Sequence, residues 1–265
     1  MLDDFQMISF HFDKPILVYP IADVHYGSIK HDRAKWTAFV RSIAEKEDAY
    51  LIMNGDLINN NVRSSKGGSP FDDTLRPREQ KKEMTEFLEP IKHKVLCMTS
   101  GNHERRSQKD ADDDVTYDIA CKLGIEDLYR PNAVFMKIGI GNQNKGGGRV
   151  GNNGAYCFAV THGSGGGIYT GGSVNKNERW GNAIDNIDCV IVGHTHKATV
   201  TRPSKIVVDP RNNRVTIKDY LVISCSSWQT YGDYALQKML LPASTCRPQI
   251  LRLNDSREKD IEVIW

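Results

Sequence analysis

Histidine, aspartate and asparagine gather in short polar clusters, each of which follows an apolar run of the chain. In chain order the clusters are Asp23-Val24-His25, Gly55-Asp56, Gly101-Asn102-His103-Glu104, His162-Gly163 and Gly193-His194-Thr195-His196. The preceding runs have the composition of buried strands. Polar loops at strand ends are where open α/β sheets place their sites. The sequence therefore predicts one composite site to which every cluster contributes.

The residue types in these clusters suit metal ions. Asp23 and His25 are two positions apart, so in an extended segment both side chains point to one face, and His194 and His196 repeat that spacing. Carboxylates, imidazoles and an amide oxygen together suit zinc, manganese, iron or nickel better than calcium. The candidate ligands are Asp23, His25, Asp56, Asn102, His162, His194 and His196. They are too many for one tetrahedral ion and fit two ions that share a carboxylate.

Alternating strands and helices are expected to position the clusters. Strands are predicted at 16–21, 50–53, 95–99, 134–140, 155–161 and 189–192, and helices at 32–46, 77–89 and 113–123. From about residue 198 onward, short β runs with turn signals predict mainly antiparallel strands. Because no repeat or low-complexity linker is visible, we expect residues 1–265 to form a single α/β domain.

Composition narrows the class of protein. The 35 Lys and Arg residues nearly balance 33 Asp and Glu residues, and a net charge of +2 carries no whole-chain signature of nucleic-acid or membrane binding. No apolar run approaches the roughly 20 residues that span a bilayer. The start, Met1-Leu2-Asp3-Asp4, lacks the pattern of a secretory signal. We therefore expect a cytoplasmic protein without a membrane partner.

Taken together, the clusters resemble the motifs of the calcineurin-like metallophosphoesterases, which run D-x-H, G-D, G-N-H-D or G-N-H-E, H and G-H-x-H. All of them are matched in order between Asp23 and His196. The resemblance implies a two-sheet β-sandwich flanked by helices, the four-layer metallophosphoesterase fold, with a dinuclear centre. It places one ion on Asp23, His25, Asp56 and His196 and the other on Asp56, Asn102, His162 and His194. Asp56 would then bridge the two ions.

The resemblance also implies hydrolysis of a phosphoester. A hydroxide shared by the ions would attack phosphorus in line. His103 remains once the ligands are assigned, so it is the candidate to stabilise the transition state and protonate the leaving oxygen. The expected cofactors are two divalent ions, Mn, Zn, Fe or Ni, with manganese favoured. Such a centre suits anionic esters but does not separate monoesters from diesters.

Departures from one branch of the superfamily bear on the substrate. Ser/Thr protein phosphatases continue the second motif as G-D-x-V-D-R-G and carry Arg before G-N-H-E. Here the second motif reads G-D-L-I-N-N-N from Gly55, and Ser100 precedes the third. The carboxylate that would pair with His103 and the arginines that grip phosphate are absent from these positions. Asn59 is expected to orient His103 by a hydrogen bond.

We therefore expect a phosphodiesterase that acts on nucleic acid or nucleotides, with Arg105 and Arg106 supplying positive charge near the substrate. A phosphomonoesterase acting on proteins or small molecules is the main alternative. A non-catalytic scaffold on the same fold is a further one, and it is disfavoured because every ligand and His103 are retained.

Some features admit two interpretations. Six glycines within 163–172 indicate either a mobile loop beside the substrate or a plain connection. Trp180, Trp228, Tyr231 and Tyr234 could stack a base or pack in the core, and the core is favoured. Arg76, Arg78, Lys81 and Lys82 are interleaved with Glu79 and Glu83, which favours a solvated helix face over a nucleic-acid patch.

Overall fold

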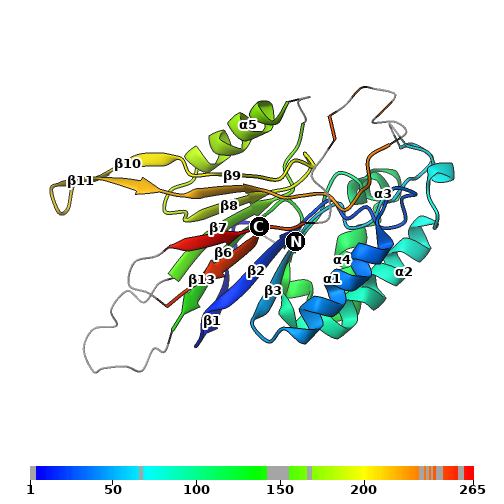
Figure 1. Ribbon diagram of the computed structural model, residues 1–265, viewed down its shortest axis with the longest axis horizontal. Helices are drawn as coiled ribbons and strands as arrows, with labels where there is room; N and C mark the ends of the chain where they lie inside the picture. Colours follow the sequence, from blue (N-terminus) through cyan, green and yellow to red (C-terminus); the bar gives the residue numbers. More distant parts are fainter. Residues whose placement is uncertain are drawn as a thin grey trace.

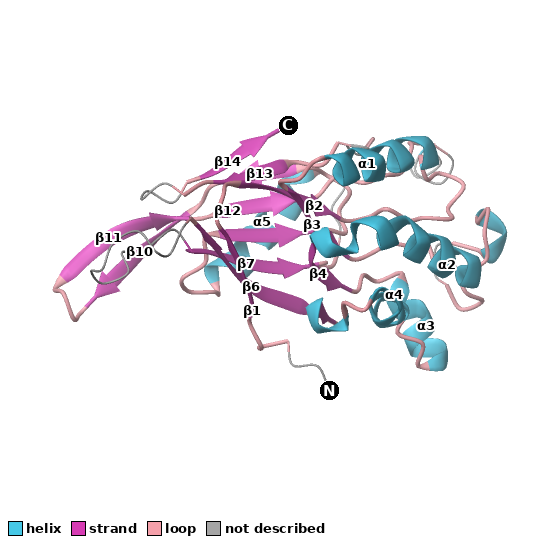
Figure 2. Cartoon of the chain, turned by 90° about the horizontal axis from the view of Figure 1, so that it is seen from below, coloured by secondary structure: helices cyan, strands magenta, loops and turns pink. Residues whose placement is uncertain are grey.

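Two mixed sheets make up most of the molecule. The computed structural model describes residues 4–65, 68–141, 155–165, 169–232, 236, 239, 241–242, 247–255 and 260–265. Within these residues the strands form two six-stranded sheets and a separate two-stranded ribbon (Figure 1). Viewed from below, the helices lie to one side of the strands apart from one helix near their centre (Figure 2).

The first sheet has the order β14-β13-β2-β3-β4-β5. Its strands are β2 (Ile16–Ile21), β3 (Ala49–Asn54), β4 (Val95–Thr99), β5 (Tyr129–Arg130), β13 (Ile250–Leu253) and β14 (Ile261–Ile264). Strands β2 to β5 are parallel, and β13 and β14 extend the sheet antiparallel. The carboxyl ends of β2, β3 and β4 therefore lie at one edge of the sheet, which is where three of the polar clusters follow.

The second sheet has the order β1-β6-β7-β8-β12-β9. Its strands are β1 (Ile8–Phe12), β6 (Ala133–Ile140), β7 (Ala155–Thr161), β8 (Cys189–Val192), β9 (Thr199–Thr201) and β12 (Leu221–Ser224). Strands β7 and β8 are parallel neighbours, with Thr161 opposite Val192. The two remaining clusters follow these strands and therefore leave the second sheet side by side.

Helices cover the outer faces of both sheets (Figure 1). They are α1 (Arg33–Glu45), α2 (Pro77–Leu88), α3 (Glu104–Ala111), α4 (Val115–Leu123) and α5 (Thr170–Asn182), with short 3-10 helices at Pro70–Asp72, Glu89–Lys94 and Glu126–Leu128. Asp32 and Asp114 cap α1 and α4 by accepting hydrogen bonds from the backbone of the first turn. None of the described helices is long and apolar enough to cross a membrane.

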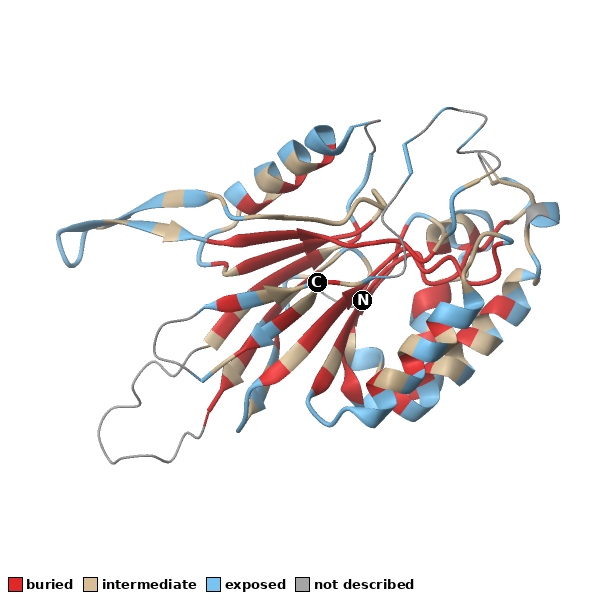
Figure 3. Cartoon of the chain, viewed as in Figure 1, coloured by how far each residue is buried: buried red, intermediate tan, exposed pale blue. Residues whose placement is uncertain are grey.

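The core is divided into layers by the two sheets. Trp36 of α1, Met84 of α2 and Ile119 of α4 pack with one face of the first sheet. The other face packs against the second sheet, as where Ile52 joins the cluster of Phe158 and Ile191. A third cluster lies between the second sheet and α5. The central strands are buried on both faces, as Figure 3 shows. Their sequences are therefore continuous apolar runs. The four-layer fold class expected from the sequence is confirmed.

Helix α5 was not expected, and its sequence explains why. TGGSVNKNERWGN is rich in glycine and asparagine, which are weak helix formers. The helix is stabilised by packing of Trp180 on the second sheet rather than by local propensity. Thr170, Gly171 and Gly172 belong to it, so the interpretation of 163–172 as a plain connection is wrong for these residues. Positions 166–168 lie outside the described residues.

The aromatic side chains considered for base stacking have different surroundings. Trp228 is buried and packs edge-on against Trp36, with ring centroids 5.0 Å apart. Tyr231 is 42% exposed, and Tyr234 lies outside the described residues. Trp180 is half-buried at the second sheet. The core interpretation is therefore right for Trp228 and for Trp180, which packs against a core cluster, whereas the exposed Tyr231 does not fit it.

Strands β10 (Ser204–Asp209) and β11 (Arg214–Asp219) form a ribbon that extends away from the two sheets (Figure 1). Ile206 pairs with Ile217 and Val208 pairs with Val215, which places these side chains on one face. All four are exposed. The ribbon adds nothing to the buried core clusters and lies apart from the polar clusters.

The segment that follows β2 is held by groups distant in sequence. The backbone N–H of Trp228 donates to the carbonyl oxygen of Asp23, at 3.0 Å, and Asp32 donates to the carbonyl oxygen of Trp228. His31 Nδ1 donates to the carbonyl oxygen of Val24, at 2.8 Å. These bonds fix the path of the loop that carries Asp23 and His25.

Protonation of His31 should weaken the fold in acid. Burial lowers the pKa of His31 to about 4, from an ordinary value near 6.5. The stabilisation from neutral His31 is therefore complete above about pH 6.5 and is lost as the pH falls toward about 4. In urea unfolding of metal-free protein, we expect the wild type to lose roughly 2 kcal/mol more than His31→Asn between about pH 7.5 and about pH 4.5. The asparagine amide keeps the donor to Val24 but does not titrate, so parallel pH curves for the two proteins would contradict this account.

Candidate metal centre

The polar clusters of the two sheets meet at one place. Asp23 and His25 follow β2, Asp56 follows β3, and Asn102 follows β4. His162 follows β7, while His194 and His196 follow β8. Contacts between atoms of these side chains join the two sets, since His162 Nε2 lies 3.2 Å from Asp56 Oδ2 and His196 Nε2 lies 3.3 Å from Asp23 Oδ1. All seven candidate ligands are therefore brought together.

The backbone of these turns is unusual. Asp23, His25, Asp56, His194 and His196 all have positive φ, between 49° and 68°. Side chains other than glycine rarely adopt this region, and such residues gather at functional sites when the surrounding structure holds them there. The turns therefore direct the polar side chains inward at a local conformational cost.

Close packing of the second and third clusters requires glycine. A Cβ atom on Gly101 would lie 2.4 Å from the backbone nitrogen of Asp56, and one on Gly55 would lie 2.6 Å from the backbone nitrogen of Gly101. Gly55 also has φ of +73°. The glycines in the G-D and G-N-H-E motifs thus let the two turns touch, which brings Asp56 next to Asn102 and His103.

Glu104 ties these two turns together. Its buried carboxylate accepts backbone hydrogen bonds from Asp56, Leu57, Ile58 and Gly101, at 2.6 to 3.1 Å. Burial and the nearby Asp56 raise the pKa of Glu104 to about 7, although the backbone donors favour its charged form. The residue types and spacing of the clusters predict no role for Glu104. Its place as the last residue of G-N-H-E was the available signal.

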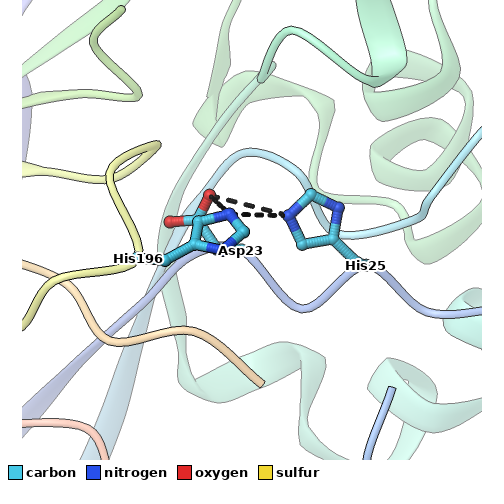
Figure 4. Close-up of side chains that lie close together, drawn as sticks. All are labelled: Asp23, His25 and His196. Carbon is cyan, nitrogen blue, oxygen red and sulfur yellow. Dashed lines mark hydrogen bonds and ion pairs between the residues drawn. The ribbon is translucent and has the colours of Figure 1, made fainter. Parts of the chain in front are cut away.

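Asp23, His25 and His196 form the first group of converging ligand atoms (Figure 4). The Nε2 atoms of His25 and His196 lie 3.1 Å apart, and His25 Nε2 lies 3.8 Å from Asp23 Oδ1. The backbone N–H of His194 donates to the other carboxylate oxygen of Asp23, at 2.8 Å. That bond leaves Oδ1 turned toward the two imidazoles.

Asp56, His162 and His194 form a second group, and Asn102 lies between the two imidazoles. The oxygen Asn102 Oδ1 is 2.7 Å from His194 Nδ1 and 3.3 Å from His162 Nε2. His162 Nδ1 donates to the carbonyl oxygen of Asn54, at 2.8 Å, which fixes the ring with Nε2 facing Asp56. A buried backbone carbonyl thus orients this imidazole, as is common for metal-binding histidines.

The buried carboxylates need positive charge nearby. Asp23 and Asp56 have exposed fractions of 0% and 1%. Burial opposes ionisation of Asp56, but His162 and His103 hold its pKa well below the usual range. Burial likewise opposes charge on His162, yet Asp56 and Asp23 raise the pKa of His162 to about 10. In His25, by contrast, burial and His103 hold the pKa well below its usual value, so this imidazole is neutral.

The donor set fits divalent metal ions. Asp23 Oδ1 is buried and has no hydrogen-bond partner among the described residues, and its closest contacts are imidazole nitrogens. At most one of the facing Nε2 atoms of His25 and His196 can carry the proton of a hydrogen bond, so the other presents a lone pair. Nitrogen and oxygen donors in such a cluster suit transition metals rather than calcium.

His103 lies at the edge of the cluster, at the start of α3. Its Nδ1 donates to the carbonyl oxygen of Asn59, at 2.6 Å, and its Nε2 is 3.9 Å from Asp56 Oδ2. Burial, together with Arg106, lowers the pKa of His103 despite the opposing charge of Asp56. The ring of His103 packs edge-on against that of His25, with centroids 4.3 Å apart. The imidazole is therefore held with Nε2 toward the cluster.

The contact between Asn59 and His103 differs from the expected one. The side-chain amide of Asn59 donates to Asp73, at 2.6 Å, and only the backbone carbonyl of Asn59 reaches His103. The side chain therefore does not orient the imidazole, and any residue at this position offers the same carbonyl. The structure thus corrects the expectation for the Asn59 side chain.

The two arginines after the third motif point to different places. Arg106 donates to His103 Nε2 at 3.1 Å, and also to Asn61 and to the carbonyl of Asn59. Arg105 donates to the carbonyl oxygen of Pro131 and to Asn132. Arg106 therefore lies against the expected acid, while Arg105 lies on the other side of α3.

Comparison of the sequence with models of known protein families identifies a family for the chain. A family model described as calcineurin-like phosphoesterase matches residues 16–198, a span that holds all five clusters. The chain therefore belongs to the calcineurin-like phosphoesterases. That description indicates hydrolysis of phosphoesters, and the family is one that typically binds divalent metals. No curated protein is significantly similar to the chain.

Two solved structures are weakly similar to the chain. A Streptococcus pneumoniae protein described as a predicted phosphoesterase has a TM-score of 0.37 and 11% identity, covering 94% of this chain and 93% of that one. GAP50, the anchor in the inner membrane complex of Plasmodium, has a TM-score of 0.43 and 11% identity, covering 91% and 82%. Likeness at this level says nothing about function.

Replacing Glu104 by glutamine should destabilise the protein. The amide keeps one acceptor oxygen but turns an NH₂ group toward backbone donors that the carboxylate now satisfies. Each buried donor left without a partner costs about 1–3 kcal/mol, so we expect Glu104→Gln to lower the free energy of unfolding by about 3 kcal/mol. Glu86→Gln, at an exposed carboxylate paired with Lys82, is the matched control and should change it by less than about 0.5 kcal/mol. Equal effects of the two substitutions in denaturant unfolding would contradict the positioning role of Glu104.

Proposed function

We propose that the chain is a dinuclear, metal-dependent phosphodiesterase that acts on nucleic acid or nucleotides. The observation that carries the proposal is the convergence of two ligand groups on the adjacent buried carboxylates Asp23 and Asp56. One ion would be held by Asp23, His25, Asp56 and His196, and the other by Asp56, Asn102, His162 and His194. Asp56 is the shared ligand in this arrangement because it contacts imidazoles of both groups.

Divalent ions in such a site activate water as a nucleophile and neutralise charge on phosphate oxygens. Manganese, zinc, iron and nickel all suit the mixture of imidazole, carboxylate and amide donors, and manganese is the ion we expect. The chain itself supplies the rigid framework: Glu104 fixes the turn that begins at Asp56, and the carbonyl oxygen of Asn54 fixes the ring of His162.

His103 is proposed as the acid that protonates the leaving oxygen. The bond from Nδ1 to the carbonyl of Asn59 leaves Nε2 as the atom that holds and delivers the proton. Because burial disfavours the imidazolium form, His103 would gain this proton as the negatively charged ester binds. Arg106, 3.1 Å from Nε2, would contact the same phosphate from the His103 side.

The diester preference rests on what is missing beside His103. Among the described residues no carboxylate pairs with His103 Nδ1, because the carbonyl oxygen of Asn59 takes that place. Arg106 is the described arginine that contacts His103, whereas the phosphatase motif supplies further arginines at positions occupied here by Asn60 and Ser100. A diester carries less negative charge than a monoester, so it needs fewer cations around it.

A comparison of substrates tests this proposal. With manganese, the wild type should release nitrophenol from bis-p-nitrophenyl phosphate faster than from p-nitrophenyl phosphate. His103→Ala should retain metal yet lose turnover by about 100-fold or more, while His93→Ala, at an exposed histidine, should match the wild type. Brisk turnover of the monoester alone would establish a phosphomonoesterase instead. Metal-loaded protein inert toward both esters would point to a non-catalytic scaffold.

Metal binding should depend on Asp56. Because Asp56 contacts both ligand groups, Asp56→Asn should weaken manganese binding by about 100-fold or more, as seen by calorimetry and by metal analysis after gel filtration. Asp13→Asn is the matched control, since its carboxylate is largely exposed and precedes β2, at the far end of that strand from the site. Equal metal content in the two variants would overturn the shared role of Asp56.

A further inference from the structure

A groove of about 490 Å³ begins at the metal centre and leads away from it. Asn102 and His162 lie among its lining residues, which connects it to the ligands. Arg105 and Lys109 of α3 line it, as do Lys176, Asn177 and Trp180 of α5. The groove is thus bounded by two helices from opposite sheets, and its volume is typical of a site for a small ligand.

The lining of the groove is cationic. Arg105, Lys109 and Lys176 contribute positive charge, and no aspartate or glutamate is among the described residues that line it. A second hollow on the surface has mixed charge instead, because several glutamates lie there beside Arg33 and Lys82. A groove with uncompensated cations next to a metal centre suits a ligand with further negative charge.

These cations are not engaged in ion pairs within the described part of the chain. Lys109 forms no hydrogen bond or ion pair with a described side chain, and Lys176 bonds only to the hydroxyl and carbonyl oxygens of Ser164. Arg105 donates to neutral partners, the carbonyl of Pro131 and Asn132. The positive charges of these three side chains are therefore not compensated by any described acidic residue and are available to a ligand.

Helix α5 adds a surface on which a base could stack. Trp180 lies one turn after Lys176, so the two side chains share a face of the helix. One side of Trp180 packs against the third core cluster, while the residue also lines the groove. Asn177, between them, is 5% exposed, and its Nδ2 has no hydrogen-bond partner among the described residues. An aromatic face, an unsatisfied amide donor and lysines together match the needs of a nucleotide unit.

We propose that this groove binds the nucleotides next to the scissile phosphodiester of a single-stranded nucleic acid. The proposal rests on the proposed function and specifies its substrate. Lys109 and Lys176 contact neighbouring backbone phosphates, Trp180 stacks with a base, and Asn177 donates to that base or its sugar. A small phosphoester ends at the metal centre and gains nothing from these groups, whereas a strand extends past Asn102 and His162 into the groove.

The double variant Lys109→Ala/Lys176→Ala separates these two kinds of substrate. On a short single-stranded oligonucleotide, kcat/KM should fall by about tenfold or more at low salt. The slope of log rate against log salt should become shallower by about 1.4, since each lost phosphate contact removes about 0.7 for a single strand. Hydrolysis of bis-p-nitrophenyl phosphate should change less than twofold. Lys82→Ala, which removes a lysine from the other hollow, is the matched control and should leave both substrates unaffected.

A second variant tests stacking and keeps an apolar side chain against the third core cluster. Trp180→Leu should raise KM for the oligonucleotide about tenfold, because loss of stacking with one base costs about 1–3 kcal/mol. Its thermal unfolding, followed in parallel, shows whether the fold is kept, and the small diester reports an intact metal centre.

The outcomes distinguish this inference from the proposed function. A wild type that cleaves neither diester contradicts the proposed function itself. A wild type that cleaves both, with an oligonucleotide rate unchanged in the lysine double variant, overturns the groove as a binding site. Equal losses on both substrates also overturn it, because the lysines would then act on the metal centre rather than on a bound strand.

Discussion

Two adjacent buried carboxylates impose the main constraint on this structure. Asp23 and Asp56 lie side by side at the junction of the two sheets, out of contact with water. Ionised carboxylates in such a place must be compensated by nearby cations or donors, because desolvation is costly. The compensation comes from distant parts of the chain: imidazoles of the second sheet face both carboxylates, and backbone N–H groups bind their remaining oxygens. The same arrangement gathers aspartate and histidine atoms into groups that could hold a metal ion.

Meeting this constraint shapes the chain around the site. The turns after the strands adopt positive φ at most of the candidate ligands, and the second and third turns are in contact through glycine. Strain of this kind persists only if the surroundings hold it. Glu104 supplies that support by gathering four backbone donors, and the apolar layer between the sheets keeps the two halves of the ligand set in register. The geometry of the candidate metal centre therefore depends on core packing as much as on the polar side chains themselves.

Helix α3 divides the surroundings of the centre into two sides. Successive residues of a helix point about 100° apart, so Arg105 and Arg106 are directed to different places. Arg106 lies against His103, where the leaving oxygen is expected, and Arg105 lines the groove that continues toward α5. One short helix thus contributes both to the proposed proton transfer and to the proposed recognition of a longer substrate.

The sequence alone determined the central strands, the order of the candidate ligands along the chain and the fold class. Apolar runs and G-D or G-H-x-H patterns are local signals. Strands β2, β3 and β8 are buried on both faces, so their sequences are continuous apolar runs that can be recognised without the structure. Tertiary structure decided the rest. The backbone carbonyl of Asn59, rather than its side chain, contacts His103. Glu104 holds the turn at Asp56 through backbone hydrogen bonds, and the glycine-rich segment before Trp180 forms a helix. These features depend on contacts between segments that are distant in the sequence, and neither residue type nor spacing encodes such long-range contacts.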